Sequence, residues 1–271
     1  ASVVYNNNVR AVRVKADDLD KINYDRLIEI YKERFADADD FEFYFVGDFK
    51  TDSIAPLLAK YLGALPTLKG SEVQKDIDLR MTKGQVKNVF EKQMETPNSV
   101  TYFIYSAPLE KDMRNVLMVD MLDQALDMLF TETVREDEGG AYGVPVNAFL
   151  QDYPEKNAVV RIQLPTSPDK RDHMAEVIYK GVDLFCDNGP KQDYVDKIKE
   201  YMHRSHAENV KKNAYWMNQI VNITRNNLNM VDGFDEMVDS ITAADLQKLA
   251  QTIFRSGNRI ELGITSPKSA E

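Results

Sequence analysis

The sequence contains a single cysteine. Cys186 is alone among 271 residues, so no disulfide bond can form within the chain. One thiol is compatible with a reducing cytosol and with a periplasm, so cysteine usage leaves the compartment open. Cys186 follows Leu184 and Phe185 in an apolar helical pattern, which predicts a position in the core.

Positive charge is also in deficit. The chain carries 34 basic and 44 acidic residues, for a formal net charge of -10. Such a surface repels phosphate backbones, and no segment of the sequence forms a local basic patch. We therefore expect no nucleic-acid partner.

Long apolar runs and several familiar motifs are missing as well. No run of about 18 apolar residues is present, so the sequence predicts no membrane span, and no segment has the pattern of a signal peptide. No glycine pattern fits a phosphate-binding loop, and no serine lies in a nucleophile elbow. These absences argue against membrane-spanning, nucleotide-binding and serine-hydrolase functions.

What the sequence does contain is enough apolar material for a full core, with 43% apolar and 10% aromatic residues. Apolar residues spaced three and four apart predict helices. The first is marked by Ile28, Tyr31 and Phe35, with Asn23 as its N-terminal cap. The other predicted helices are at 52–62, 111–135, 168–187, 191–228 and 243–255. β-branched and aromatic runs predict strands at 41–49, 86–94, 99–106, 141–150, 157–164 and 259–265. The strands at 86–94 and 99–106 are joined by the turn residues "ETPN". Because strands come in pairs between helices, the pattern favours an α+β fold, an antiparallel sheet packed with helices, over a parallel doubly wound sheet.

Three histidines are the candidates for metal binding. His203 and His206 lie three residues apart on a predicted helix, where both rings could face one metal ion. No third ligand is evident near them, so an ordinary solvated helix face is the favoured interpretation. His173 has a glutamate three residues later but lacks the second histidine of an HxxEH or HExxH site, so we expect no zinc there.

The segment "REDEGGAYGV", residues 135–144, follows the predicted helix 111–135. Gly139 and Gly140 supply the flexible backbone that ends a helix, and a strand is expected after them. Arg135 and Tyr142 therefore flank a helix-to-strand corner, a usual place to present side chains to a ligand. Local physics alone gives neither residue a function, since an arginine at a helix C-terminus and a tyrosine entering a strand are both ordinary.

Several stretches together resemble the C-terminal half of the pitrilysin/insulinase family of zinc metallopeptidases, the inverzincins, most closely its large single-chain bacterial members. In order they are "YKERFADADDFEFYFVGDF", "LAKYLGALP", the Arg135 to Tyr142 spacing, "NAYWMNQIVN" and "SITAADLQKLAQTIF". The resemblance implies four related α+β domains that form two half-shells around a chamber. It also implies a zinc ion bound by HxxEH and a downstream glutamate in the first domain. This chain has no HxxEH, so it looks like an excised C-terminal piece that itself binds no metal.

The resemblance also implies a division of the chain and roles for two residues. Residues 1–70 would be the tail of a preceding peptidase-like domain, 71–85 a linker and 86–271 the C-terminal peptidase-like domain. Tyr142 would be catalytic and substrate-binding, donating its hydroxyl to the oxyanion that forms on the scissile carbonyl. Arg135 would bind backbone carbonyls of the peptide substrate.

Two functions follow from this resemblance. The first is a half-shell portion of a zinc metalloendopeptidase, whose partners are the N-terminal half of the same protein and the peptide substrate. The alternative is a catalytically inert structural or processing-partner subunit of the same family. Retention of both Arg135 and Tyr142 favours the first function. Bacterial members are often exported, so a periplasmic location is compatible with the resemblance.

Overall fold

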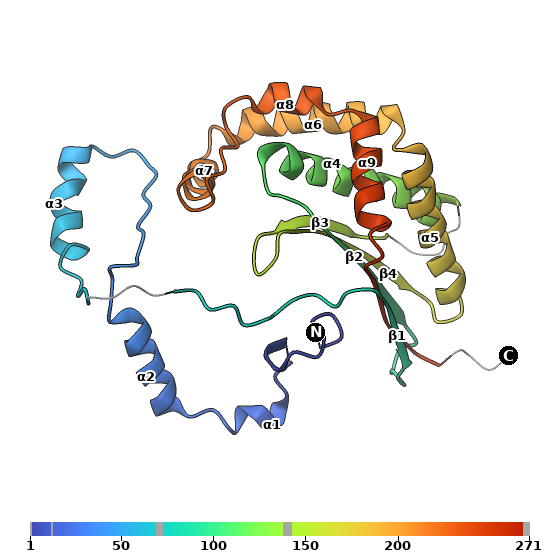
Figure 1. Ribbon diagram of the computed structural model, residues 1–271, viewed down its shortest axis with the longest axis horizontal. Coiled ribbons are helices and arrows are strands. Elements are labelled where there is room, and N and C mark those ends of the chain that lie inside the picture. Colours follow the sequence, from blue (N-terminus) through green and yellow to red (C-terminus); the bar gives the residue numbers. More distant parts are fainter. Residues whose placement is uncertain (1, 12, 69–72, 138–142, 268–271) are drawn as a thin grey trace.

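The computed structural model describes residues 2–11, 13–68, 73–137 and 143–267. Its centre is one β-sheet with helices packed on one face, and the N-terminal segment extends away from that layer pair (Figure 1). The predicted class, an α+β fold with a mainly antiparallel sheet, is confirmed. Within the described residues, no helix is both long and apolar enough to cross a membrane.

The sheet is built from strands that are distant in sequence. Its order is β1-β5-β2-β4-β3, and the strands are β1 (Gln85–Glu91), β2 (Ser99–Pro108), β3 (Val146–Gln151), β4 (Asn157–Thr166) and β5 (Arg259–Thr265). Only the β1–β5 pair is parallel among these neighbours. The C-terminal strand thus lies beside the first two strands and closes the domain.

The short connection between the first two strands does not make a hairpin. The sequence predicts strands at 86–94 and 99–106 joined by a turn, but β1 and β2 are not neighbours, because β5 lies between them. In the register, Val89 of β1 and Thr101 of β2 flank Gly263 of β5 from opposite sides. A Cβ atom at Gly263 would lie 2.9 Å from a methyl group of Val89, so only glycine fits between the two strands.

Three helices cover one face of the sheet: α4 (Met113–Phe130), α5 (Arg171–Asn188) and α9 (Ala243–Phe254). A fourth, α6 (Gln192–Asn209), packs against α4 on the side away from the sheet, and all four contribute to the main core. Alternate residues of β2 and β4, such as Phe103 and Ile162, point into this core, as period-two alternation requires. Leu122 and Phe130 of α4 are fully buried against them. The start of α9 is fixed by a capping box, in which Thr242 and Asp245 bond each other's backbone N–H groups.

The opposite face of the sheet carries a smaller apolar cluster of Ile104, Val159 and Ile260. Val3, Val4 and Met81 pack against it. The N-terminal residues thus lie next to the chain that leads into β1, and the Thr82 N–H donates to the Val4 carbonyl oxygen at 2.8 Å.

The N-terminal segment contains a 3-10 turn (η1, Val9–Ala11) and three helices: α1 (Ala16–Leu19), α2 (Tyr24–Phe35) and α3 (Thr51–Tyr61). The predicted cap of α2 is confirmed, because the Asn23 side chain accepts a hydrogen bond from the Arg26 N–H. None of α1, α2 and α3 has a buried residue. In Figure 1, α2 and α3 stand apart from the sheet.

The predicted strand at 41–49 is wrong for this structure. Residues 41–46 have no regular secondary structure, and the side chains of Phe41, Phe43 and Phe45 are 36–45% exposed. A strand gains its hydrogen bonds from a neighbouring strand, and the sheet in this chain lies elsewhere. The aromatic pattern is therefore present without a sheet edge to pair with.

Two predicted helices differ from the observed ones. The expected helix 111–135 is α helical only in α4 and continues as a π-helix, η2 (Thr131–Asp137). The expected helix 191–228 is two helices, α6 and α7 (Asn213–Asn226), separated by a turn at 210–212. The indole N–H of Trp216 donates to the Val210 carbonyl at 2.7 Å, which satisfies one of the acceptors freed by this break. The short helix α8 (Phe234–Ser240) was not predicted from the sequence.

Candidate functional site

The two predicted site residues lie at the limit of the described chain. Arg135 falls within the π-helix η2, but its side chain is outside the described part of the structure. Tyr142 belongs to 138–142, which also lies outside the described residues. Their separation and their roles therefore stay predictions, and the surrounding elements define where the segment between them begins and ends.

The π-helix that carries Arg135 is anchored through Glu132. The Glu132 carboxylate accepts hydrogen bonds from Lys191 Nζ at 2.5 and 2.6 Å and from the Tyr194 hydroxyl. These bonds hold the pKa of Glu132 below its usual range, and the bond from Lys191 has the larger effect. Two residues later, Val134 is completely buried. π-Helical turns are rare and often occur at functional sites, so this anchored turn is a suitable support for a ligand-binding arginine.

The other end of the segment is anchored as well. Val144 is buried, and the Pro145 carbonyl accepts a hydrogen bond from the Gln163 N–H at 2.9 Å, just before β3 begins. Residues 138–142 therefore connect two fixed points, Val134 in the helical layer and Val144 at the sheet.

Three acids, Asp120, Asp123 and Asp127, lie along α4. Asp123 accepts a hydrogen bond from the Ala148 N–H of β3 at 2.5 Å. Burial raises the pKa of Asp123 to about 6, and the Ala148 bond offsets only part of that effect. Asp120 and Asp127 lie about one turn before and one turn after Asp123. Desolvation by neighbouring protein atoms raises the pKa of both, although both residues are exposed at the surface. The sequence analysis did not single out these acids. They could have been noticed because they are spaced three and four residues apart, on one face of a mostly apolar helix.

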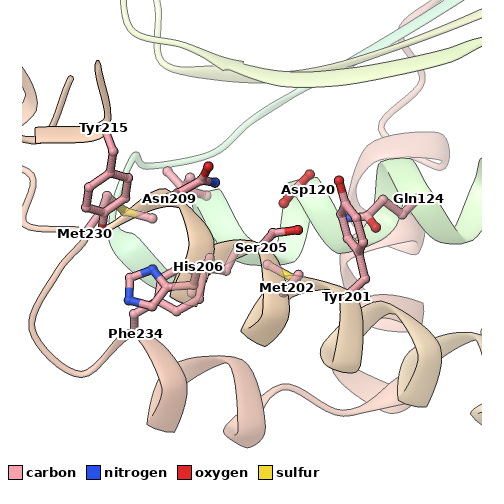
Figure 2. Close-up of a pocket in the computed structure, with 12 residues that line it drawn as sticks. Asp120, Gln124, Tyr201, Met202, Ser205, His206, Asn209, Tyr215, Met230 and Phe234 are labelled. Carbon is pink, nitrogen blue, oxygen red and sulfur yellow. The ribbon is translucent and has the colours of Figure 1, made fainter. Parts of the chain in front are cut away.

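A cavity of about 600 Å³ opens beside Asp120 (Figure 2). It lies between α4, α6, the start of α7 and residues 230–234. Its lining combines apolar, aromatic and polar side chains: Val116, Leu117, Asp120, Gln124, Tyr201, Met202, Ser205, His206, Asn209, Tyr215, Met230 and Phe234. Because these residues are spread over more than 100 positions of the sequence, no local motif predicted the cavity.

The histidine pair at 203 and 206 does not form a metal site. The His203 ring lies between two carboxylates of α8, with Nδ1 at 2.8 Å from Asp235 and Nε2 at 2.9 Å from Asp239. These ring nitrogens point in opposite directions, so the two carboxylates cannot converge on one ion. His206 instead stacks on Phe234 with ring centroids 4.0 Å apart. Among the residues that the structure describes, no group of three or more His, Cys, Asp or Glu could hold a metal ion.

The position of His203 predicts a pH-dependent contribution to stability. The hydrogen bonds with Asp235 and Asp239 raise the pKa of His203 above its unfolded value of about 6.5, and Asp235 has the larger effect. The charged pairs therefore stabilise the fold fully below about pH 6.5, and this contribution is lost as the pH rises through the folded pKa. We expect His203→Gln to lower the free energy of unfolding more at about pH 5.5 than at about pH 8.5, by a modest amount because the site is partly exposed. Urea titrations at the two pH values measure it.

The matched control for this prediction is Asp235→Asn. It removes one of the two carboxylates that hold the imidazolium and should reduce the pH dependence without abolishing it, because Asp239 remains. A destabilisation by His203→Gln that is the same at both pH values would contradict the assignment.

Cys186 has the surroundings of a structural residue. It is buried in the main core, and burial raises the pKa of its thiol to about 11. A thiol that stays protonated at neutral pH is neither a nucleophile nor a metal ligand. The predicted core position of Cys186 is confirmed.

Comparison with known proteins agrees with the family suggested by the sequence motifs. The family model described as "Peptidase M16 inactive domain" matches residues 21–202. A zinc protease PQQL-like protein of Arabidopsis thaliana is 20% identical over 235 residues, covering 80% of this chain and 24% of that protein. The chain therefore spans about a quarter of the length of this curated relative.

Solved structures of proteases share the fold. One is the ferredoxin protease FusC, in complex with Arabidopsis ferredoxin. Its TM-score with this chain is 0.81 at 14% sequence identity, and the match covers 98% of this chain and 29% of that chain. Another is the periplasmic protease PqqL of Escherichia coli, with a TM-score of 0.70 at 12% identity, covering 81% of this chain and 24% of that chain. At these low sequence identities, the structural similarity shows a shared fold only. The family is shown by the family model, because that model matches most of the chain. The chain belongs to the peptidase M16 inactive domain family, and the predicted relationship to zinc metallopeptidases is confirmed.

Proposed function

We propose that this chain is the C-terminal, non-zinc-binding part of a half-shell of a zinc metalloendopeptidase. The observation that carries the proposal is the match of residues 21–202 to the inactive domain of a peptidase family whose relatives include a zinc protease. In this proposal the chain contributes substrate binding and oxyanion stabilisation, and the remainder of a longer protein contributes the hydrolytic centre.

Arg135 and Tyr142 are the residues that would act on the substrate. Peptide hydrolysis places negative charge on the scissile carbonyl oxygen, and a hydroxyl held at that point lowers the barrier. Tyr142 would donate this hydrogen bond. Arg135 would hold backbone carbonyls of the peptide with the N–H groups of its planar guanidinium. The anchored turn at Glu132 and the buried Val144 support this assignment, because they fix both ends of the corner.

The described residues of this chain do not fit a zinc site. The sequence has no HxxEH, and the two carboxylates nearest His203 lie on opposite sides of its ring. His206 is stacked against Phe234 rather than directed at acids. The zinc ion would therefore be bound by the N-terminal half of the protein, which supplies Lewis-acid activation there. The part played by this chain is to bind and orient the peptide.

The N-terminal segment supports the proposed partner and domain division. Residues 1–70 would complete a preceding peptidase-like domain, residues 71–85 would link the two, and residues 86–271 would form the last domain. In the first of these ranges, large apolar side chains are exposed on α2, on α3 and between them, among them Tyr24, Leu27, Tyr31, Phe35, Phe41, Phe43, Phe45, Phe49, Leu57 and Tyr61. So much exposed apolar surface is typical of a protein contact surface. The N-terminal half of the same protein would cover it and provide a sheet edge for residues 41–49.

We expect the isolated chain to bind no stoichiometric zinc and to cleave no peptide. The reason is that the sequence has no HxxEH and that the described residues contain no group of three His, Cys, Asp or Glu able to hold a metal ion. Metal analysis after dialysis, combined with a quenched fluorescent peptide assay, measures both properties. Near-equimolar zinc together with chelator-sensitive cleavage would contradict the proposal. Activity without zinc that survives a chelator would point to a contaminating protease, and a second purification step identifies it.

The second candidate function is a catalytically inert structural or processing-partner subunit. The observation in its favour is that the matching family model describes an inactive domain. The sequence upstream of this chain in its gene separates the two functions. An HxxEH with a later glutamate supports the peptidase, and its absence supports a subunit that depends on a partner or is inert.

A further inference from the structure

The cavity between α4, α6 and α7 has the size of a ligand site and plays no part in the proposed catalytic role. Its volume of about 600 Å³ lies within the range of roughly 300–1,000 Å³ that is typical of ligand pockets. Figure 2 shows two ends of the cavity: Asp120, Gln124 and Tyr201 lie at one, and His206, Asn209, Tyr215, Met230 and Phe234 lie at the other.

The first end offers a carboxylate that lacks a cation. Among the described residues, no lysine, arginine or histidine forms an ion pair with Asp120, whose side chain is reachable by solvent. Nearby protein atoms desolvate it enough to raise its pKa, and a hydrogen bond from Gln124 offsets part of this effect. A guanidinium or ammonium group from a ligand would restore the lost solvation with a charge-assisted hydrogen bond. The same carboxylate repels anionic ligands such as nucleotides.

The second end offers aromatic surface. His206 stacks on Phe234 with an angle of 11° between the rings, and the Tyr215 ring meets His206 edge-on at 5.8 Å. Within the described part of the chain, the buried hydroxyl of Tyr215 has no hydrogen-bond partner. This hydroxyl is itself closed to solvent, so the part of Tyr215 that faces the cavity is its ring. A ligand here would therefore present apolar or aromatic surface to the rings of His206, Tyr215 and Phe234.

The spacing of the two ends fits a peptide. Tyr201 and Asn209 lie eight residues apart on α6, which is about 12 Å at 1.5 Å per residue. An extended chain covers that length with about four residues at roughly 3.3 Å each. We propose that this cavity binds a short extended peptide segment that carries an arginine or lysine at one end and an apolar or aromatic residue at the other. The site is independent of Arg135 and Tyr142, and the proposal holds for either function considered above.

The only tryptophan of the chain provides a direct readout of binding. Trp216 lies beside the cavity, with its ring edge-on to Tyr215 at 5.4 Å. The probes are blocked tetrapeptides with arginine and phenylalanine at the two ends and glycine between them, made in both orders. Two analogues are matched to them: citrulline in place of arginine removes the charge and keeps the shape, and glycine in place of phenylalanine removes the ring. Titrations followed by Trp216 emission and by calorimetry give the dissociation constants.

We expect saturable binding of the arginine peptide in at least one order, and binding of the citrulline peptide about tenfold weaker, as for the loss of one charged hydrogen bond. Asp120→Asn should weaken the arginine peptide by the same factor and abolish the discrimination against citrulline. The glycine analogue should also bind more weakly, because it leaves Phe234 without a contact. The matched control is Asp127→Asn, which changes an acid on the same helix that does not line the cavity. It should leave all dissociation constants unchanged.

Circular dichroism and size-exclusion chromatography confirm that each variant remains folded before it is titrated. No heat and no change in emission up to millimolar peptide would overturn the proposal. Equal affinity for the arginine and citrulline peptides, or equal weakening by Asp120→Asn and Asp127→Asn, would overturn it as well.

Discussion

Replacing Arg171 with methionine is expected to lower the free energy of unfolding by about 3–5 kcal/mol, because it removes the buried cation that faces a buried carboxylate. The carboxylate belongs to Glu261 of β5, which is 1% exposed, and Arg171 at the start of α5 is 6% exposed. Arg171 donates a hydrogen bond to Glu261, and the Tyr179 hydroxyl donates another at 2.5 Å. Lys87 lies 3.2 Å from the same carboxylate. Burial alone would raise the pKa of Glu261, but these partners bring it below its usual range, so the group is charged in the folded state.

Urea denaturation at pH 7 measures the loss, and a double variant makes the cause explicit. If the cost arises from the unpaired charge, Arg171→Met combined with Glu261→Gln should recover most of the stability that Arg171→Met loses, because no buried charge is left alone. An exposed ion pair gives the comparison: Asp187→Asn breaks the contact with Arg255 at the surface and should cost less than about 1 kcal/mol. A double variant as unstable as the sum of the two single variants would contradict this explanation and point to lost packing instead.

Much of the fold was accessible from the sequence because its elements carry their own signals. The strand predicted at 259–265 is β5 with the same limits, and the helix predicted at 243–255 is α9 to within one residue. Each has a clear apolar period and a defined start or stop. The antiparallel sheet and its helical layer followed from the order of these elements rather than from any single segment.

The errors occurred where the conformation depends on distant partners. The aromatic run at 41–49 has the composition of a buried strand, but pairing needs a neighbouring strand that this chain does not place beside it. The insertion of β5 between β1 and β2 is likewise a contact between residues more than 150 positions apart. Local propensity contains no information about such pairings.

The candidate sites differ in the same way. Arg135 and Tyr142 were found because a motif and a family resemblance mark them, although local physics gives an arginine at a helix end no special role. The cavity beside Asp120 was missed because its walls come from α4, α6, α7 and residues 230–234. The absence of a cation beside Asp120 among the described residues is a property of the packed structure, so the sequence alone does not reveal it.

Under the proposed function, Tyr142→Phe in the full-length protein is expected to lower kcat by roughly 10²–10³, the scale for removing one oxyanion donor. The substitution removes one hydroxyl and keeps the ring, so the fold should change little. Arg135→Ala should also raise KM, because its contacts with backbone carbonyls exist in the bound substrate as well as in the transition state. Arg135→Lys should restore only part of the activity, since an ammonium lacks the planar fork of the guanidinium. Steady-state kinetics on one peptide compares the three variants, and melting curves confirm that each is folded.

The central claim is that the corner between η2 and β3 takes part in peptide hydrolysis carried out with another part of the protein. The most direct test is kcat of the complete protein with Tyr142→Phe, measured at saturating peptide and compared with the unsubstituted protein under the same conditions. We predict a fall of about two to three orders of magnitude with an unchanged melting temperature. Turnover at the unsubstituted rate would contradict the claim and would leave the corner with a purely structural role.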